Sequence, residues 1–286
     1  MSISNEVLQS LNFERLPQVK KPKYVVFCDF DETYYPHNMD DSKRSNMKLL
    51  EKYLYEHGSK GDLVIGWVTG SSLESIVEKM KKGSIQYFPH FVASGLGTEI
   101  TYFDSNGTTI EDQIWEERII EGGFDSSKIE RILKLLELKY EIFLRPQTQL
   151  GSSKYKFNFY YEEQNEFIDA KNLEKIEEIG EIFQVGVNIN KCNPLAGDPE
   201  NCYDVDFIPL GTGKDEIVKF ILDKYELDKT NAIAFGDSGN DLRMLQAVRH
   251  GYLVENATEE AKNTHSMLAQ GEYSIGILNT LKHIIN

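Results

Sequence analysis

The chain has 286 residues, of which 40% are hydrophobic and 27% charged, and its formal net charge is -15. This composition is that of a globular protein and excludes a disordered or membrane-spanning chain. The negative charge argues against a nucleic-acid surface, because phosphate backbones require basic patches. A small phosphorylated ligand, held by a few cations and a metal ion, remains possible.

The cysteines and the N-terminus predict a reducing, cytoplasmic location. The three cysteines have no zinc-type spacing. A disulfide between Cys192 and Cys202 is conceivable but not favoured, and the first residues contain no apolar signal segment.

Strands alternate with helical patterns along most of the chain, which is typical of a wound parallel sheet. Apolar runs predict a buried strand at 24–28, another at 62–70, a strand and hairpin at 90–103, a strand, turn and helix at 231–245, and a short strand at 251–257. A helix is expected to begin near Lys214.

Residues 114–205 have a different character. They predict a helix at 127–140, an alternating strand at 154–162, a charged helix at 170–180, and an alternating strand at 182–190, followed by a loop with Pro194, Gly197 and Pro199. Period-two alternation implies half-buried antiparallel strands. We therefore expect an inserted α+β domain at 114–205 and a core domain formed by 1–113 and 206–286.

Four scattered stretches carry polar residues beside predicted strands and helices. They are DFDET with Asp29 and Asp31, VIGWVTG with Thr69, GTGKD with Lys214, and GDSGND with Asp237 and Asp241. Each alone has an ordinary explanation as an acidic turn or a helix cap. GTGKD is not a nucleotide-binding P-loop, because Ile208 and Asp215 replace a required Gly and a required Ser or Thr.

Together the stretches predict a phosphate site. In a parallel sheet Asp29, Thr69 and Asp237 follow the carboxyl ends of strands, at one edge of the domain. The four aspartates would then converge, and like charges about 4 Å apart repel by roughly 4 kcal/mol at an effective dielectric of about 20. Such a cluster requires protonation or a cation, and an oxygen-rich site that engages phosphate suits Mg²⁺. Thr69 and Lys214 would supply donors to an oxyanion.

In order and spacing these motifs resemble those of the haloacid dehalogenase (HAD) superfamily of phosphatases. The resemblance covers roughly 22–113 and 206–286, and it implies a Rossmann-like core with a C2-type cap at the insertion. SGLGTEITY and DFIPLGTGK are similar to the sucrose-phosphate phosphatase branch. FCDFDETYY resembles the phosphatases that act on kanosamine 6-phosphate in amino-sugar antibiotic pathways. One departure is Glu32, where many members have Gly; we expect its carboxylate to face solvent or the cap.

The resemblance also implies roles for individual residues. Asp29 would be the nucleophile, with Asp31 as general acid and base. Mg²⁺ would be held by Asp29, the Asp31 backbone carbonyl and Asp237, with Asp241 behind them to orient Lys214 or a metal-bound water. The expected phosphate contacts are Thr69, Gly70, Ser71, Lys214 and Asn240.

The cap would select the sugar. Alternation in KYKFNFYY places Lys154, Lys156, Asn158 and Tyr160 on one face, and Tyr155, Phe157, Phe159 and Tyr161 on the other. We expect the aromatic set to pack under the cap helices. The polar set, Lys156 and Asn158 above all, would either contact sugar hydroxyls or form a solvated face, and Asn188 and Asn190 invite the same reading. Arg145 is expected to be a surface charge.

The predicted function is Mg²⁺-dependent hydrolysis of a hexose 6-phosphate, with a preference for an amino-hexose. The preference is expected because the chain has many carboxylates, including Glu32, that would attract an ammonium group. The alternatives are a sucrose-6-phosphate phosphatase, a phosphomutase, and a non-catalytic sugar-phosphate binding protein. No nucleic-acid or membrane partner is expected, and the sequence does not predict the oligomeric state.

Overall fold

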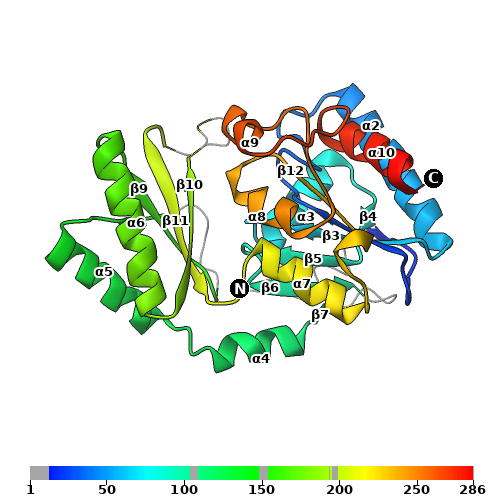
Figure 1. Cartoon of the computed structure of the whole chain (residues 1–286). Helices are drawn as coiled ribbons and strands as arrows, with labels where there is room; N and C mark the ends of the chain where they lie inside the picture. Colours follow the sequence, from blue (N-terminus) through cyan, green and yellow to red (C-terminus); the bar gives the residue numbers. More distant parts are fainter. Residues whose placement is uncertain (1–12, 104–108, 148–153, 193, 195–198, 286) are drawn as a thin grey trace. The chain divides into compact units, whose positions relative to one another are not determined.

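The computed structural model describes residues 13–103, 109–147, 154–192, 194 and 199–285 (Figure 1). The chain forms two compact units, one made of Met1–Asp112 with Lys214–Asn286 and one made of Gln113–Gly213. The second unit is inserted into the first. The chain leaves the first unit after Asp112 and re-enters it at Lys214, which is the first residue of helix α7 (Lys214–Lys224).

The first unit is built on a mostly parallel sheet with the strand order β13-β12-β2-β3-β5-β6-β7. The parallel strands are β2 (Tyr24–Cys28), β3 (Leu63–Val68), β5 (Phe91–Ser94), β12 (Ala232–Gly236) and β13 (His250–Leu253). The antiparallel strands β6 (Glu99–Phe103) and β7 (Thr109–Glu111) extend one edge. The expected parallel sheet and the hairpin after β5 are confirmed.

Helices cover both faces of this sheet. Helices α2 (Asp41–Ser59), α3 (Leu73–Gly83) and α10 (Tyr273–Ile285) contribute to one hydrophobic core with Val26, Cys28, Ile65 and Trp67. Helix α8 (Leu242–Ala247) joins β12 to β13, on the other side of β2 from β3, so a right-handed crossover places it on the opposite face, where α7 contacts it. The last short helix, α9 (Glu259–Thr264), follows β13.

The described part of the N-terminal segment packs on the first unit. Strand β1 (Glu14–Arg15) pairs with β4 (Tyr87–Phe88). The buried ring of His90 lies between two backbone groups, where Nε2 donates to Pro17 O at 3.0 Å and Nδ1 accepts from Ile65 N–H at 3.1 Å. Sequence reasoning assigned no role to residues 1–22, and residues 1–12 lie outside the described chain.

The second unit is an antiparallel sheet with helices on one face. The strand order is β10-β11-β9-β8, and the elements are α4 (Gln113–Glu121), α5 (Ser126–Tyr140), β8 (Arg145–Pro146), β9 (Phe157–Glu162), α6 (Glu166–Ile182), β10 (Val185–Lys191) and β11 (Cys202–Pro209). As expected, Phe157, Phe159 and Tyr161 pack with residues of α5 and α6.

Strand β11 is missing from the sequence-based prediction. Val205 and Phe207 are buried in the same core as β9, so β11 belongs to the inserted sheet. The expected domain boundary at 205/206 therefore falls inside a strand, and the compact unit continues to Gly213.

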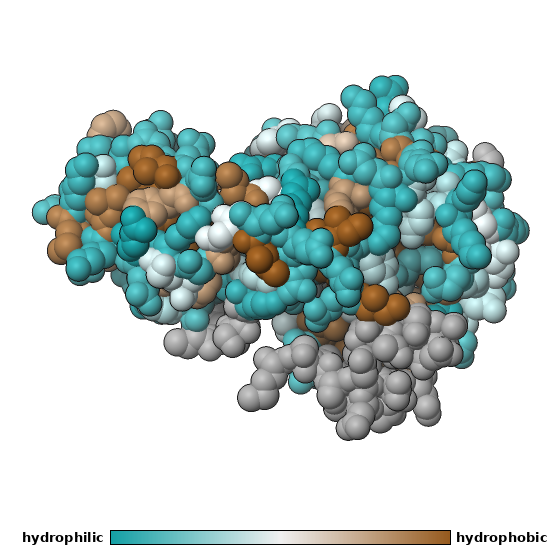
Figure 2. All heavy atoms as spheres, turned by 90° about the horizontal axis from the view of Figure 1, so that it is seen from below, coloured by the Kyte–Doolittle hydropathy of each residue, from teal (hydrophilic) through white to brown (hydrophobic). Residues whose placement is uncertain are grey.

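The face shown in Figure 2 is mostly hydrophilic, with hydrophobic residues in separate patches. Within the described residues, no helix has both the length and the apolar character needed to cross a membrane.

Candidate active site

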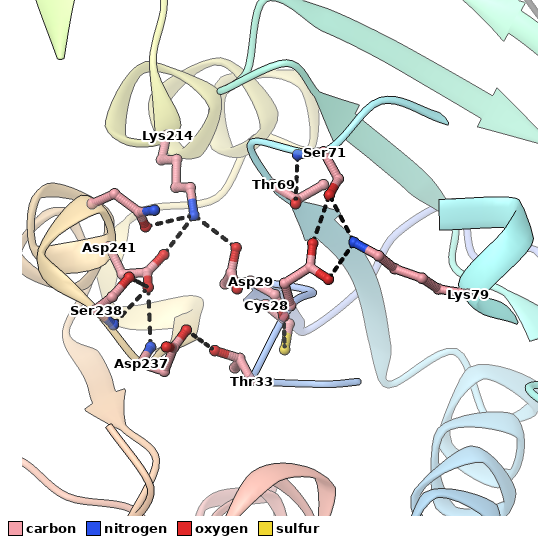
Figure 3. Close-up of polar contacts among 12 residues, drawn as sticks. Cys28, Asp29, Thr33, Thr69, Ser71, Lys79, Lys214, Asp237, Ser238 and Asp241 are labelled. Carbon is pink, nitrogen blue, oxygen red and sulfur yellow. Dashed lines mark hydrogen bonds and ion pairs between the residues drawn. The ribbon is translucent and has the colours of Figure 1, made fainter. Parts of the chain in front are cut away.

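Three neighbouring strands deliver polar residues to one edge of the main sheet. Strand β2 lies between β12 and β3, and Asp237, Asp29 and Thr69 follow these strands directly. The backbone N–H of Asp29 continues the ladder by donating to Phe235 O at 2.9 Å. All three side chains are buried, and Figure 3 shows them converging. As predicted, these three residues lie at the carboxyl ends of parallel strands.

A buried lysine lies among the carboxylates. Lys214 Nζ is 2.7 Å from Asp29 Oδ1, 2.6 Å from Asp241 Oδ1 and 3.0 Å from Asn240 Oδ1 (Figure 3). Lys214 is only 4% exposed, so its charge is compensated by these carboxylates and not by water. Asn240 presents its carbonyl oxygen to Lys214, which leaves its amide nitrogen as the donor end.

Asp241 is fixed by the backbone of the preceding turn. Its Oδ2 accepts from the N–H groups of Asp237 at 3.0 Å and Ser238 at 3.1 Å. A Cβ at Gly236 would lie 2.3 Å from Asp241 Cβ, so only glycine permits this close approach. The motif GDSGND thus aims one oxygen of Asp241 at Lys214 and uses the other to hold the turn.

The carboxylate group fits a divalent cation. Oxygens of Asp29, Asp237 and Asp241 lie within 4.8 Å of one another. Burial, followed by the charges of nearby carboxylates, raises the pKa of Asp29 and of Asp237 above the usual range for Asp. A cation would relieve this repulsion, and hard oxygen donors are the ligands of Mg²⁺. Thr33 Oγ1 donates to Asp237 Oδ1 at 2.9 Å and orients that carboxylate.

The carboxylate of Asp31 does not join this group, contrary to expectation. It accepts from Lys79 Nζ at 2.5 Å, Ser71 Oγ at 2.6 Å and His37 Nε2 at 2.7 Å. Burial opposes its ionisation, but the hydrogen bond from His37 and the charge of Lys79 hold the pKa of Asp31 well below its usual range. The side chain therefore carries a negative charge in this arrangement.

Sequence reasoning missed His37 and Lys79. His37 lies in a loop without periodicity, and Lys79 lies on an amphipathic helix where a lysine is unremarkable in the pattern. One sequence feature could have drawn attention to Lys79. It lies about two turns into α3, counted from the N-cap Ser72.

The expected phosphate donors are only partly available for that role. Ser71 N–H donates to Thr69 Oγ1 at 3.0 Å, which leaves the hydroxyl proton of Thr69 for another acceptor. Ser71 Oγ instead donates to Asp31. Gly70 lies between them, and a Cβ there would meet Leu96 Cδ2 at 3.4 Å.

The side chain of Glu32, expected to face solvent or the cap, is 27% exposed, and its carboxylate is hydrogen-bonded within the first unit. Its Oε1 accepts from His37 N–H at 2.7 Å and its Oε2 from the Tyr273 hydroxyl at 3.1 Å. These bonds use its carboxylate to hold the turn, so it is a poor candidate for an ammonium group of a substrate.

The inserted sheet carries polar groups on the face away from its helices. Asn158 Nδ2 donates to Asp206 Oδ1 at 2.5 Å, and Asn188 Nδ2 to Asp206 Oδ2 at 3.2 Å. Lys156 and Tyr160 are buried, so the reading as a solvated face is wrong for them. Sequence reasoning missed Asp206 because β11 was not predicted.

Other residues of this unit have local partners. Lys154 pairs with Glu116, and exposed Arg145 lies 3.4 Å from Glu162 Oε1, as a surface charge would. No disulfide joins the cysteines, which all lie in the described part of the chain; Tyr160, Cys192 and Cys202 form a small buried cluster.

The sequence comparisons with known proteins agree with one another in that each finds a hydrolase. Residues 22–284 match the family model of sucrose-6F-phosphate phosphohydrolase. The kanosamine-6-phosphate phosphatase of Bacillus subtilis (strain 168) is 58% identical over 273 residues, which is 96% of each chain. An uncharacterised hydrolase of Staphylococcus aureus (strain N315) is 30% identical over 92% of this chain and 97% of its own.

Solved structures agree with the observed fold. A haloacid dehalogenase-like hydrolase from Bacillus subtilis matches with a TM-score of 0.78 and 56% identity, over 98% of this chain and 99% of its own. The sucrose-phosphatase of Synechocystis, solved with sucrose and phosphate, matches with a TM-score of 0.70 and 19% identity, over 92% and 98%. The second likeness concerns the fold alone.

Proposed function

We propose that this chain, which belongs to the sucrose-6F-phosphate phosphohydrolase family, hydrolyses an amino-hexose 6-phosphate with Mg²⁺. The chain is a phosphosugar phosphatase with a HAD-type fold. Its preferred substrate would be kanosamine 6-phosphate. The observation that supports catalysis most directly is the buried triad of Asp29, Lys214 and Asp241, in which Lys214 lies 2.7 Å from the proposed nucleophile.

The reaction would proceed in two displacements at Asp29. A carboxylate oxygen of Asp29 attacks phosphorus, the bond to the sugar oxygen breaks, and an aspartyl-phosphate forms. Water then attacks phosphorus, releases phosphate and restores the carboxylate. Lys214 and the hydroxyl of Thr69 would stabilise the charge on the phosphoryl oxygens. Bound Mg²⁺, held by Asp29, Asp237 and the Asp31 carbonyl, would supply further positive charge there.

Asp31 would protonate the departing sugar oxygen and later accept a proton from water. It is ionised while bonded to Lys79, His37 and Ser71, so it must gain a proton before it acts as an acid. The rearrangement that weakens these bonds is part of the proposal. The positive charge of Lys79 keeps Asp31 ionised, which is the form that the second role needs, but it also lowers the basicity of the carboxylate, so both roles require that rearrangement.

The inserted unit would act as a C2-type cap that selects the sugar. Asn158 and Lys156 are its proposed substrate contacts. Asp206, held between Asn158 and Asn188, would contribute negative charge beside them without being a direct partner of the ammonium group. Sites built around hydrogen-bonding groups reject analogues that lack them more strongly than apolar pockets do. The relative that is 58% identical is named for an amino-sugar phosphate, which supports the same choice.

The test is a phosphate-release assay over kanosamine 6-phosphate, glucosamine 6-phosphate, glucose 6-phosphate and sucrose 6-phosphate, each with and without Mg²⁺. We expect kcat/KM to be highest for kanosamine 6-phosphate and activity to disappear after EDTA treatment and return with Mg²⁺. A higher kcat/KM for sucrose 6-phosphate than for the amino-hexose phosphates would overturn the amino-hexose assignment. Isomerisation of the sugar phosphate without phosphate release would indicate a mutase, and binding without turnover a non-catalytic protein.

A further inference from the structure

The turn after Asp31 has an unusual backbone that distant residues hold in place. Glu32 has φ 57, a conformation that favours glycine. Asn256 Nδ2 donates to the Glu32 carbonyl at 2.7 Å, and the Tyr273 hydroxyl donates to the Glu32 carboxylate. Ser274 Oγ donates to Tyr34 O at 2.9 Å. A residue without glycine's freedom is thus held in a strained turn by three donors.

This turn determines where the Asp31 carbonyl points. A trans peptide is planar, with its C=O and N–H pointing in opposite directions, and no peptide bond of the described chain is cis. Glu32 N–H donates to Tyr35 O at 2.9 Å. The Asp31 carbonyl, the proposed backbone ligand of Mg²⁺, must therefore point away from Tyr35 O. A change of φ at Glu32 would therefore reorient this carbonyl relative to the rest of the turn.

The segment that carries Asn256 also holds the second ligand loop. Val254 N–H donates to Gly236 O at 3.0 Å, and Thr258 N–H donates to Asp237 O at 2.8 Å. Asn256 lies between these two anchors and reaches across to Glu32. One five-residue stretch, 254–258, is therefore bonded to both loops that would supply metal ligands.

Asn256 uses both ends of its amide. Its Oδ1 accepts from Tyr273 N–H at 2.9 Å, while its Nδ2 donates to the Glu32 carbonyl. The first bond holds the start of α10, where Tyr273 has φ 48. Only the second bond reaches the loop of the proposed metal ligands. A carboxylate in place of the amide would keep the acceptor and lose the donor.

We propose that Asn256 is a positioning residue that locks the Asp31 turn to the Asp237 loop and thereby sets the affinity for the divalent cation. This inference rests on the proposed use of Mg²⁺. It assigns to Asn256 no contact with substrate or metal. Partners that orient metal ligands typically contribute about 10- to 100-fold in metal affinity, and an effect of that size is expected here.

The experiment measures Mn²⁺ binding to the full-length protein by electron paramagnetic resonance, with Mn²⁺ as the probe for the Mg²⁺ site, at one pH and without substrate. We compare the wild type with Asn256→Ala, Asn256→Asp and the control Asn279→Ala. Asn279 also donates from a side-chain amide to a carbonyl, Gln270 O at 2.8 Å, but it is exposed and touches neither loop. Thermal unfolding of each variant is recorded in parallel.

Both Asn256 variants are expected to bind Mn²⁺ about 10- to 100-fold more weakly, with the control unchanged. The charge added by Asn256→Asp would by itself attract the cation, so a loss in that variant points to the missing donor. Wild-type Mn²⁺ affinity in Asn256→Asp, or in a folded Asn256→Ala, would overturn the inference. If the wild type itself binds no Mn²⁺, it is the proposed metal dependence that fails.

Discussion

Lys214 Nζ lies 2.6 Å from Asp241 Oδ1, and both side chains are almost fully buried. Burial disfavours the charge on Lys214, but Asp241 and Asp29 outweigh it and raise the pKa of Lys214 above its usual value. The lysine thus stays a cation in this buried site, and in the proposed mechanism Asp241 would stay bonded to it while Asp29 reacts.

Replacing Asp241 by Asn should therefore lower turnover by about 10- to 100-fold, because Lys214 loses a charged partner. The single oxygen of the amide can accept the two backbone N–H groups of the turn or face Lys214, but not both. Steady-state phosphate release measures the effect. Asp228→Asn is the matched control, since Asp228 also accepts a backbone N–H, from Thr230, but is exposed. Equal activity of Asp241→Asn and wild type would contradict the role given to Asp241.

Asp29→Asn should reduce phosphate release by at least about 10³-fold, because an amide is not a competent nucleophile. The substitution keeps the side-chain size, and Lys214 keeps its bond to Asp241, so the protein should remain folded. Rapid-quench detection of phosphate bound covalently to the wild-type protein, and its absence in Asp29→Asn, tests the intermediate. A covalent phosphoprotein that survives in the variant would assign the nucleophile elsewhere.

Asp31→Asn should slow the reaction to a degree that depends on the leaving group of the substrate. A sugar alkoxide needs a proton as it departs, whereas p-nitrophenolate leaves readily without one. We expect kcat with a hexose 6-phosphate to fall about 10²- to 10⁴-fold, in the range of general acid–base catalysis, and the formation of p-nitrophenol from the aryl phosphate in a single turnover to fall much less. Asp125→Asn, at an exposed helix cap in the inserted unit, is the control. An equal loss with both substrates would argue that Asp31 acts through metal or loop geometry alone.

His90 should make stability depend on pH in the acid range. Burial lowers the pKa of His90 to about 4, with its backbone bonds to Pro17 and Ile65 opposing the shift. The unfolded chain, with a His pKa of about 6.5, takes up the proton first. The free energy of unfolding should therefore fall by up to about 3 kcal/mol as the pH drops from about 6.5 to about 4.

Urea unfolding between those pH values tests this expectation in wild type and His90→Gln. The variant should be less stable at neutral pH, because it loses the matched donor and acceptor, but its stability should depend less on pH. His283→Gln, at an exposed position, should keep the wild-type slope. Identical slopes in wild type and His90→Gln would rule out His90 as the titrating group.

The sequence predicted those parts of the site that strand ends control. Asp29, Thr69 and Asp237 follow apolar runs, and parallel strands bring such positions to one edge regardless of the distance along the chain. Lys214 was placed in the site by the family resemblance, which also named Asp241 as a residue that orients Lys214 or a metal-bound water. Strand periodicity alone could not place it, because its partners Asn240 and Asp241 come from a different βα connection.

The remaining parts depend on tertiary contacts that leave no periodic signal. His37, Lys79 and Asn256 reach the Asp31 turn only through side-chain bonds, from a loop, a helix and the segment after a strand. The conformation of Asp31 follows from its local donors, and the strand-end argument could not choose between a carboxylate that joins Asp29 and one that turns to Lys79. Strand β11 was not predicted because the expected domain boundary at 205/206 was placed between the loop before the strand and the Lys214 motif after it. That boundary falls inside the strand.

The insertion of the second unit has a mechanical consequence for catalysis. Lys214 is the first residue after that unit, and the link before it contains Gly211 with φ 77 and Gly213 with φ 119. Side chains other than glycine rarely adopt such φ values, so a substitution there would shift the first turn of α7. Lys214, the cation proposed to neutralise phosphate, is therefore also the residue at which the inserted unit is joined to α7. A fault in this linker would be observed as a fault in the active site, although no linker atom need touch the substrate.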